Sequence, residues 1–169
     1  MCKKRPFARG GFSIIEAAMA TAILGIGITA LISAVGASTS ANGRANELTS
    51  GVFLAQQVRE WTVRLPFSDP DESPTAPVGP EQTSPQEFVD DLDDLMDVTF
   101  CPPRDGAGRP ITEMPDWSQV VKMTWRDPDS LATPVGAGAS DVIYVEVSVL
   151  RAGRCVHTTG WFAARRPTE

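Results

Sequence analysis

An apolar run near the start of the chain limits what this protein can fold into. From Phe12 to Val35 the sequence holds one charged residue, Glu16. A helix of that length spans the roughly 30 Å of hydrocarbon in a bilayer. The apolar core of a cleaved secretory signal is shorter and precedes its small-residue cleavage site. Here Gly10 and Gly11 come before the run. We therefore expect a transmembrane helix over 12–35 that stays on the mature protein, with an uncleaved signal anchor as the simpler alternative.

The residues before the run are basic. Lys3, Lys4, Arg5 and Arg9 precede it, and no acidic residue comes before Glu16. A basic flank of this kind stays in the cytoplasm, so we expect a single pass through membrane lipid with an exported C-terminal domain. The whole chain has a net charge of −6, which argues against a nucleic-acid partner because such surfaces are usually basic.

Two further features suggest that the helix packs against other helices. Ala18 and Ala22 are four residues apart, as are Ala30 and Ala34, and such pairs let helix backbones approach closely in lipid. Small residues are also simply common in membrane helices. The retained Glu16 strengthens the first interpretation, because a charge inside a membrane is costly and is a functional hypothesis by default.

Beyond Val35 the sequence turns polar, but it contains no proline until Pro66. Leu48, Val52 and Ala55, followed by Val58 and Trp61, recur at helical spacing, which indicates one apolar face. The pattern predicts a single helix from about Phe12 to Leu65, whose second part, 36–65, is amphipathic. Three glycines within this second part would weaken the helix by roughly 1 kcal/mol each relative to alanine.

The next segment, 66–87, is rich in proline and is predicted to be a surface loop, because proline at this density excludes helix and central strand. A short helix over Phe88–Met96 is expected to follow. Several aspartates of 90–97 invite a calcium interpretation, but EF-hand spacing is missing, so a solvated acidic face is favoured and no metal site is assigned. These aspartates are Asp90, Asp91, Asp93, Asp94 and Asp97.

The C-terminal part, 88–169, is predicted to form a small antiparallel β-meander. In Asp141–Leu150 apolar and polar residues alternate, with Ile143, Val145 and Val147 on one face. "RAGR" is a tight turn, after which Arg154–Ala163 returns as the hairpin partner. Shorter strands are expected at 98–101 and 118–126. The expected fold class is α+β, with the Leu48–Leu65 stripe of the helix covering the sheet.

Little in the sequence supports catalysis. The chain has one histidine, His157, and no phosphate-binding loop or credible nucleophile–base set. We expect no enzymatic activity and no cofactor. From the residues alone, an anchored domain that binds a partner without polymerising is one candidate function, and a subunit that assembles through its helix is the other.

The stretch "GGFSIIEAAMATAILGIGITALISA" resembles the N-terminus of type IV pilins and type II secretion pseudopilins. That family combines a short basic leader, a glycine, a methylated residue that is usually phenylalanine, and a glutamate that opens a long apolar helix. Gly11, Phe12 and Glu16 match these positions. The resemblance covers about the first 65 residues. The later "ELTSGVFLAQQVREW" is similar to minor pilins of the V type and pseudopilins of the I type.

The resemblance implies a processing route and a set of partners. A prepilin peptidase would remove the leader, 1–11, between Gly11 and Phe12 and methylate the new amine of Phe12. Glu16 would pair with the N-terminal amine of a neighbouring subunit during assembly. Other pilin or pseudopilin subunits and an inner-membrane assembly platform would be the partners, with the exported domain in the periplasm. The expected function is that of a minor pilin or pseudopilin.

Two further points follow from the resemblance. Many major pilins have a helix-bending proline in the membrane segment, whereas this chain has none there, which fits a minor subunit better. Cys101 and Cys155 resemble the C-terminal disulfide of many pilins, with two unpaired thiols as the alternative. The pilus, secretion and DNA-uptake systems remain equally open from these residues.

Overall fold

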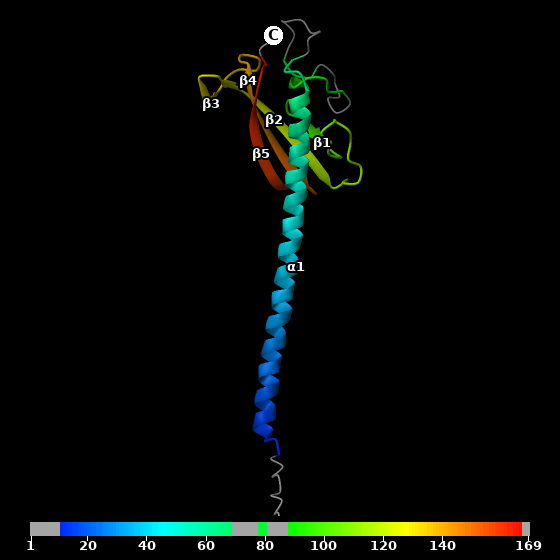
Figure 1. Ribbon diagram of the computed structural model, residues 1–169, viewed down its shortest axis with the longest axis vertical. Coiled ribbons are helices and arrows are strands. Elements are labelled where there is room, and N and C mark those ends of the chain that lie inside the picture. Colours follow the sequence, from blue (N-terminus) through cyan, green and yellow to red (C-terminus); the bar gives the residue numbers. More distant parts are fainter. Residues whose placement is uncertain (1–10, 69–77, 81–87, 167–169) are drawn as a thin grey trace, which may run out of the picture. The chain divides into compact units, whose positions relative to one another are not determined.

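The computed structural model describes residues 11–68, 78–80 and 88–166 (Figure 1). The chain forms two compact units, Met1–Ala45 and Asn46–Glu169. Most of the expected leader and most of the expected proline-rich loop lie outside the described residues. The helix α1, Ile14–Arg64, contributes to both units. This confirms the prediction of one uninterrupted helix, which follows from the lack of proline between these residues.

The second unit contains an antiparallel sheet, in the α+β arrangement that the sequence predicts. Its strands lie in the order β1-β2-β4-β5, and β3 pairs with the end of β2. The prediction missed β3. The strand bounds are Thr99–Phe100 for β1, Trp117–Asp127 for β2, Ser130–Pro134 for β3, Val142–Arg151 for β4 and Arg154–Ala164 for β5.

The predicted tight turn between β4 and β5 is confirmed. Ala152 and Gly153 both have positive φ, 49° and 76°, and Arg151 pairs with Arg154 across the turn. Two consecutive positive φ values give a turn whose twist matches that of the flanking strands. The hairpin register therefore follows from a two-residue loop that the sequence marks with its glycine.

The core lies between one face of the sheet and the second part of α1. Ile143, Val145, Val147 and Val149 of β4 are completely buried, as the alternation predicts. Each pairs with a buried residue of β2, for example Val147 with Val121. Apolar area removed from water in this way is the main favourable contribution to folding.

The face that α1 turns to the sheet differs partly from the predicted stripe. Ala55, Val58 and Trp61 are buried as expected, but Leu48 and Val52 are 49% and 37% exposed. The buried face begins instead at Gly51, where an added Cβ would lie 3.2 Å from side-chain atoms of both Val156 and His157 of β5. A hydrophobicity pattern overlooks this glycine, although its missing side chain is what lets the helix approach the strand.

A buried amide joins three parts of the second unit. The side-chain nitrogen of Gln119 in β2 donates to the carbonyl oxygens of Leu54 in α1, at 2.9 Å, and of Arg104, at 3.0 Å. Its oxygen accepts the Arg104 backbone N–H at 2.6 Å. Gln119 is completely buried, and these bonds satisfy it, as a buried polar side chain requires.

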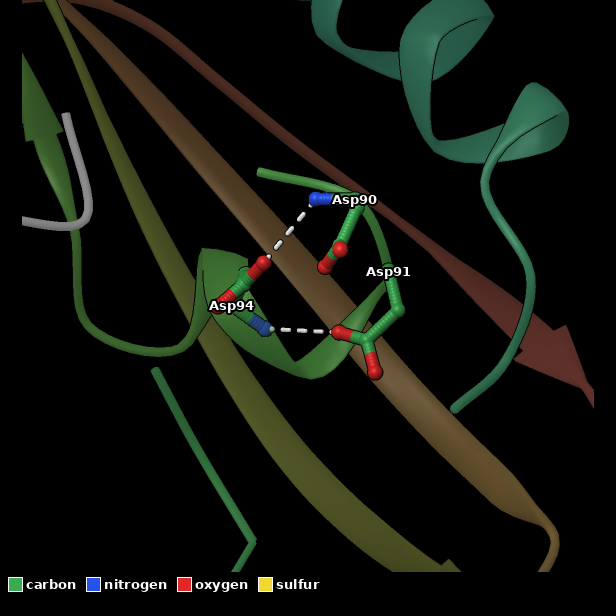
Figure 2. Close-up of side chains that lie close together, drawn as sticks. All are labelled: Asp90, Asp91 and Asp94. Atoms are coloured by element: carbon green, nitrogen blue, oxygen red, sulfur yellow. Dashed lines mark hydrogen bonds between the residues drawn. The ribbon is translucent and has the colours of Figure 1, made fainter. Parts of the chain in front are cut away.

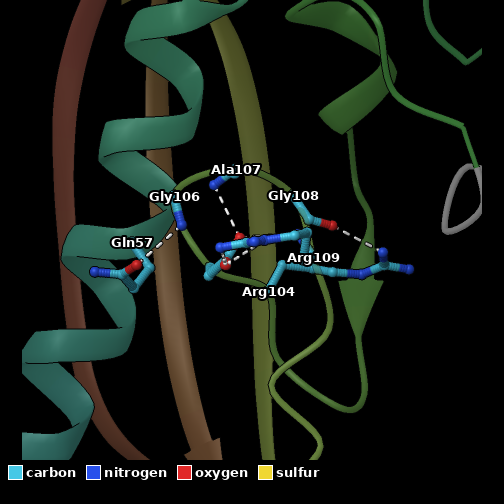
Figure 3. A network of polar contacts seen from close by, with 7 residues as sticks. Gln57, Arg104, Gly106, Ala107, Gly108 and Arg109 are labelled. Atoms are coloured by element: carbon cyan, nitrogen blue, oxygen red, sulfur yellow. Dashed lines mark hydrogen bonds and ion pairs between the residues drawn. The ribbon is translucent and has the colours of Figure 1, made fainter.

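A hydrogen bond to the side chain of Gln57 holds the loop after β1 against α1, and further hydrogen bonds close the loop on itself (Figure 3). The Gly106 N–H donates to Gln57 Oε1 at 2.9 Å, and Arg104 Nη1 donates to the Gly108 carbonyl at 2.8 Å.

Within the loop, Asp105 accepts from the backbone N–H groups of Ala107 and Arg109. Desolvation raises the pKa of Asp105, but these bonds outweigh it, so its pKa lies below the ordinary value.

A cluster of charges fastens α1 to the β4–β5 hairpin. Glu47 Oε1 accepts from Arg151 Nη1 at 2.8 Å, and Glu47 Oε2 accepts from Arg154 Nη2 at 2.6 Å. The hydrogen bond from Arg154 is the main reason that the pKa of Glu47 lies below its ordinary value, and Arg151 adds to the effect.

The acidic segment departs most from its prediction. Only Asp93–Leu95 form a helix, a single 3-10 turn called η1 here. Leu92 and Leu95 are buried as expected, but so are Asp91, Asp93 and Asp94, so the favoured solvated acidic face is wrong. The two leucines enter the core, and the aspartates between and before them are carried inward with the backbone.

Candidate functional site

The residues that match the motif begin the described part of the chain. Gly11, Phe12 and Ser13 are exposed and precede the first helical residue, Ile14. The side chain of Phe12 is 81% exposed, and nothing lies within 4 Å of a Cβ added to Gly11. The peptide bond between Gly11 and Phe12 is therefore accessible in a non-helical segment, the kind of backbone that a peptidase can bind.

Glu16 lies in the first turn of α1 and is exposed. Its backbone N–H donates to the Ser13 carbonyl at 3.1 Å, and so does the N–H of Ala17. A negative side chain is favoured at this end of a helix, where unpaired N–H groups create a partial positive charge. Glu16 follows Phe12 closely in the sequence. Its side chain is exposed and does not belong to the core of the described residues.

The first part of α1 presents apolar side chains on all its faces. The helix contains a window with mean hydropathy of 2.1, none of it buried in the structure, and it is long enough to cross a membrane. An apolar surface of this extent calls for lipid or protein around it. The large exposed apolar residues of this part are Phe12, Ile14, Ile15, Met19, Ile23, Leu24, Ile26, Ile28, Leu31, Ile32 and Val35.

The few hydroxyl groups within this surface are satisfied by the helix itself. Thr29 Oγ1 donates to the Gly25 carbonyl at 2.8 Å, and Ser33 Oγ donates to the Thr29 carbonyl at 3.0 Å. Thr21 bonds to the preceding turn in the same way. Internal bonds of this kind lower the cost of placing a hydroxyl in hydrocarbon. Glu16 is thus the residue in this surface whose side chain most needs an outside partner.

The two cysteines of the second unit are not bonded to each other. Both are free and exposed. Cys101 directly follows β1 and Cys155 lies in β5, at opposite edges of the sheet with β2 and β4 between them. At the usual strand spacing the backbones are about 14 Å apart, whereas a disulfide needs Cα atoms within about 7 Å. The prediction of a disulfide between Cys101 and Cys155, which came from the resemblance, is therefore wrong.

Sequence reasoning missed the contacts that hold the second unit together. Glu47 meets two arginines more than a hundred positions later, and nothing local marks that pairing. Gln119 carried a usable signal, because it is the polar residue among the inward-facing positions of β2. A polar residue in such a row is usually a buried hydrogen-bonding group.

Comparison of the chain with protein-family models, with curated proteins and with solved structures finds no match. The functional conclusion therefore rests on the N-terminal residues and the surface of α1.

Proposed function

We propose that this protein is a minor pilin or pseudopilin, a structural subunit assembled into a type IV pilus-like or type II secretion filament after prepilin peptidase processing. One observation carries the proposal. An accessible Gly11–Phe12 peptide immediately precedes a helix whose first turn bears Glu16 and whose following turns are apolar on every side.

The chemistry of assembly follows from that arrangement. Hydrolysis of the Gly11–Phe12 bond creates an amine on Phe12, which is then methylated and keeps its positive charge. In lipid a carboxylate without a cation pays a large desolvation cost, and a nearby cation offsets it. Glu16 of one subunit therefore pairs with the Phe12 amine of a neighbour, and this pairing sets the axial register between packed helices.

The same proposal gives the protein a place in the cell. The basic start remains in the cytoplasm, the apolar part of α1 crosses the inner membrane, and the sheet-containing unit is exported. In the membrane the subunit meets the peptidase and the assembly platform.

Mass spectrometry of the mature N-terminus tests the proposal. In a host with a prepilin peptidase, the protein is expected to begin with N-methyl-phenylalanine at Phe12, and in the matching peptidase deletion it should keep residues 1–11. Gly11→Val should block processing, because it places a branched side chain next to the peptide bond that the peptidase must bind, where glycine has none. Gly10→Ala, one residue earlier, is the matched control and should be processed.

An N-terminus that keeps residues 1–11 in the competent host would exclude the pilin-like route. That result would favour the alternative of a signal-anchored domain that binds a partner without polymerising.

A further inference from the structure

Three aspartates in and just before η1 bring their carboxylates together (Figure 2). Asp90, Asp91 and Asp94 each offer one carboxylate oxygen, and these oxygens all lie within 4.8 Å of one another. Two hydrogen bonds from backbone N–H groups to carboxylate oxygens hold the side chains in this arrangement. Asp91 Oδ1 accepts the Asp94 N–H at 3.1 Å, and Asp94 Oδ2 accepts the Asp90 N–H at 3.0 Å. Figure 2 shows the three side chains close together, with these two hydrogen bonds as dashed lines.

A second observation indicates that the cluster needs a ligand. Asp91 and Asp94 are completely buried, and Asp94 Oδ1 is a buried oxygen with no hydrogen-bond partner among the residues that the structure describes. Among the described residues no basic side chain forms an ion pair with Asp94. A buried carboxylate oxygen without a donor is strongly unfavourable, and such an atom commonly marks the position of an ion or water.

We propose that Asp90, Asp91 and Asp94 bind a calcium ion. Calcium prefers oxygen ligands at 2.3–2.6 Å, so ligands on opposite sides of the ion are about 5 Å apart, which matches the 4.8 Å limit on the cluster. The set contains only carboxylates, whereas zinc and copper favour nitrogen and sulfur ligands. Asp90 is exposed, so water reaches the rim and can complete the coordination.

The position of the cluster predicts what calcium would do. The Leu92 N–H donates to the Pro66 carbonyl at 3.0 Å, just after α1. Leu92 and Leu95 are buried in the core, and Asp93 Oδ2 accepts the Gly79 N–H at 2.8 Å. The ion would neutralise a buried charge in the segment that ties the end of α1 to the sheet. Because it binds the folded state, it would stabilise the second unit by mass action. The inference does not depend on the proposed filament role.

The test uses the full chain in a nonionic detergent after removal of metal with a chelating resin. Unfolding is followed by tryptophan fluorescence, since Trp61, Trp117 and Trp125 are buried in the second unit. We expect 1 mM CaCl2 to raise the melting temperature by about 5 °C. Calorimetric titration should give one ion per chain, and 1 mM MgCl2 should produce less than half of the shift.

Three variants locate the effect. Asp94→Asn should abolish the calcium shift and should melt no lower than the original protein in chelator, because it removes a buried charge and keeps the side-chain shape. Asp90→Asn changes an exposed member of the cluster and should weaken calcium binding at least tenfold. Asp97→Asn is the matched control. It is exposed in the same segment at φ 55°, a conformation that asparagine also tolerates, and it should keep the full shift.

The proposal is overturned if calcium neither binds nor raises the melting temperature. It is equally overturned if Asp90→Asn and Asp94→Asn both keep the shift, or if magnesium matches calcium, since either result would indicate general screening of surface charge.

Discussion

Glu16 and Glu47 are carboxylates on the same helix in opposite circumstances. Glu47 has its countercharges within its own chain, from Arg151 and Arg154. Glu16 has no ion-pair partner in the described part of the chain and lies on the helix part suited to lipid. Folding alone explains Glu47, whereas Glu16 calls for a partner outside the chain.

Substitution of Glu16 tests that difference. Glu16→Gln should be processed and methylated normally, but its incorporation into filaments should fall at least tenfold, because a neutral amide offers the neighbouring amine no countercharge. Thr21→Val, which removes a polar group one turn further along, is the control and should assemble normally. The measurement is the ratio of filament to membrane protein by quantitative immunoblot. Equal incorporation of Glu16→Gln would remove the pairing role.

The pKa of Glu47 predicts a pH dependence. Its folded-state pKa is lowered from 4.5, chiefly by the hydrogen bond from Arg154. Its contribution to stability is therefore present above the unfolded pKa and lost as the pH falls through the folded one. Glu47→Gln should lower the melting temperature by a few degrees at pH 7, and the difference should shrink toward pH 3. The exposed Glu113→Gln should show no such difference, and a constant gap across this range would contradict the prediction.

At the scale of elements, the helix and the sheet meet through residues with small or polar side chains as well as through the apolar core. Gly51 sets how closely α1 approaches β5, and Gln119 bonds both α1 and the loop after β1. These contacts are specific because each depends on the shape or bonding of one side chain. Larger apolar neighbours contribute burial but tolerate more variation.

The close approach at Gly51 can be tested by adding a side chain. Gly51→Val should lower the free energy of unfolding by about 1–3 kcal/mol, because overpacking forces neighbouring atoms apart. Gly43→Val, on the same helix with open space around the added Cβ, should change it by less than about 1 kcal/mol. Urea denaturation followed by tryptophan fluorescence measures both. Similar values for the two variants would show that the contact does not limit packing.

The buried amide gives a second prediction at this scale. Gln119→Leu should lower the free energy of unfolding by about 2–4 kcal/mol, because it removes three hydrogen bonds that a completely buried side chain makes to the backbone of Leu54 and Arg104. Thr124→Leu, half-buried on the other face of β2, is the control and should be nearly neutral. The same denaturation measurement applies, and a neutral Gln119→Leu would contradict the role assigned to the amide.

These elements also show how far the sequence could predict the fold. The long helix and the β4–β5 hairpin follow from local signals, namely the lack of proline and a strict alternation that ends in a glycine turn. The sequence did not predict which face of α1 packs on the sheet, because Gly51, where the buried face begins, carries no hydrophobic signal. Burial of Asp91 and Asp94 also escaped, since their surroundings come from distant parts of the chain. At the N-terminus, the order of Gly11, Phe12 and Glu16 was fully readable, because that segment depends on no tertiary contact.

At the scale of the whole molecule, the two units differ in what surrounds them. The described residues of the first unit are exposed throughout, and the buried core belongs entirely to the second. One unit is therefore complete as a folded domain, and the other requires lipid or neighbouring helices. Such a division suits a protein whose N-terminal helix lies in a membrane.

Free thiols in the second unit allow a test of membrane orientation. A membrane-impermeant maleimide added to intact spheroplasts should label Cys101 and Cys155, because both are exposed and the proposed topology places them on the exported side. The Cys101→Ser/Cys155→Ser double variant is the control and should remain unlabelled. Labelling that requires permeabilised cells would place this unit in the cytoplasm and reverse the proposed topology.

The short strand β3 offers a practical opportunity. All five residues of Ser130–Pro134 are exposed, and the strand pairs only with the last two residues of β2. A small epitope or fluorophore inserted there would leave the core residues and the N-terminal motif untouched. If the protein assembles as proposed, light or electron microscopy could then locate each copy along the filament, and thereby distinguish a subunit that caps the tip from one that is scattered through the shaft.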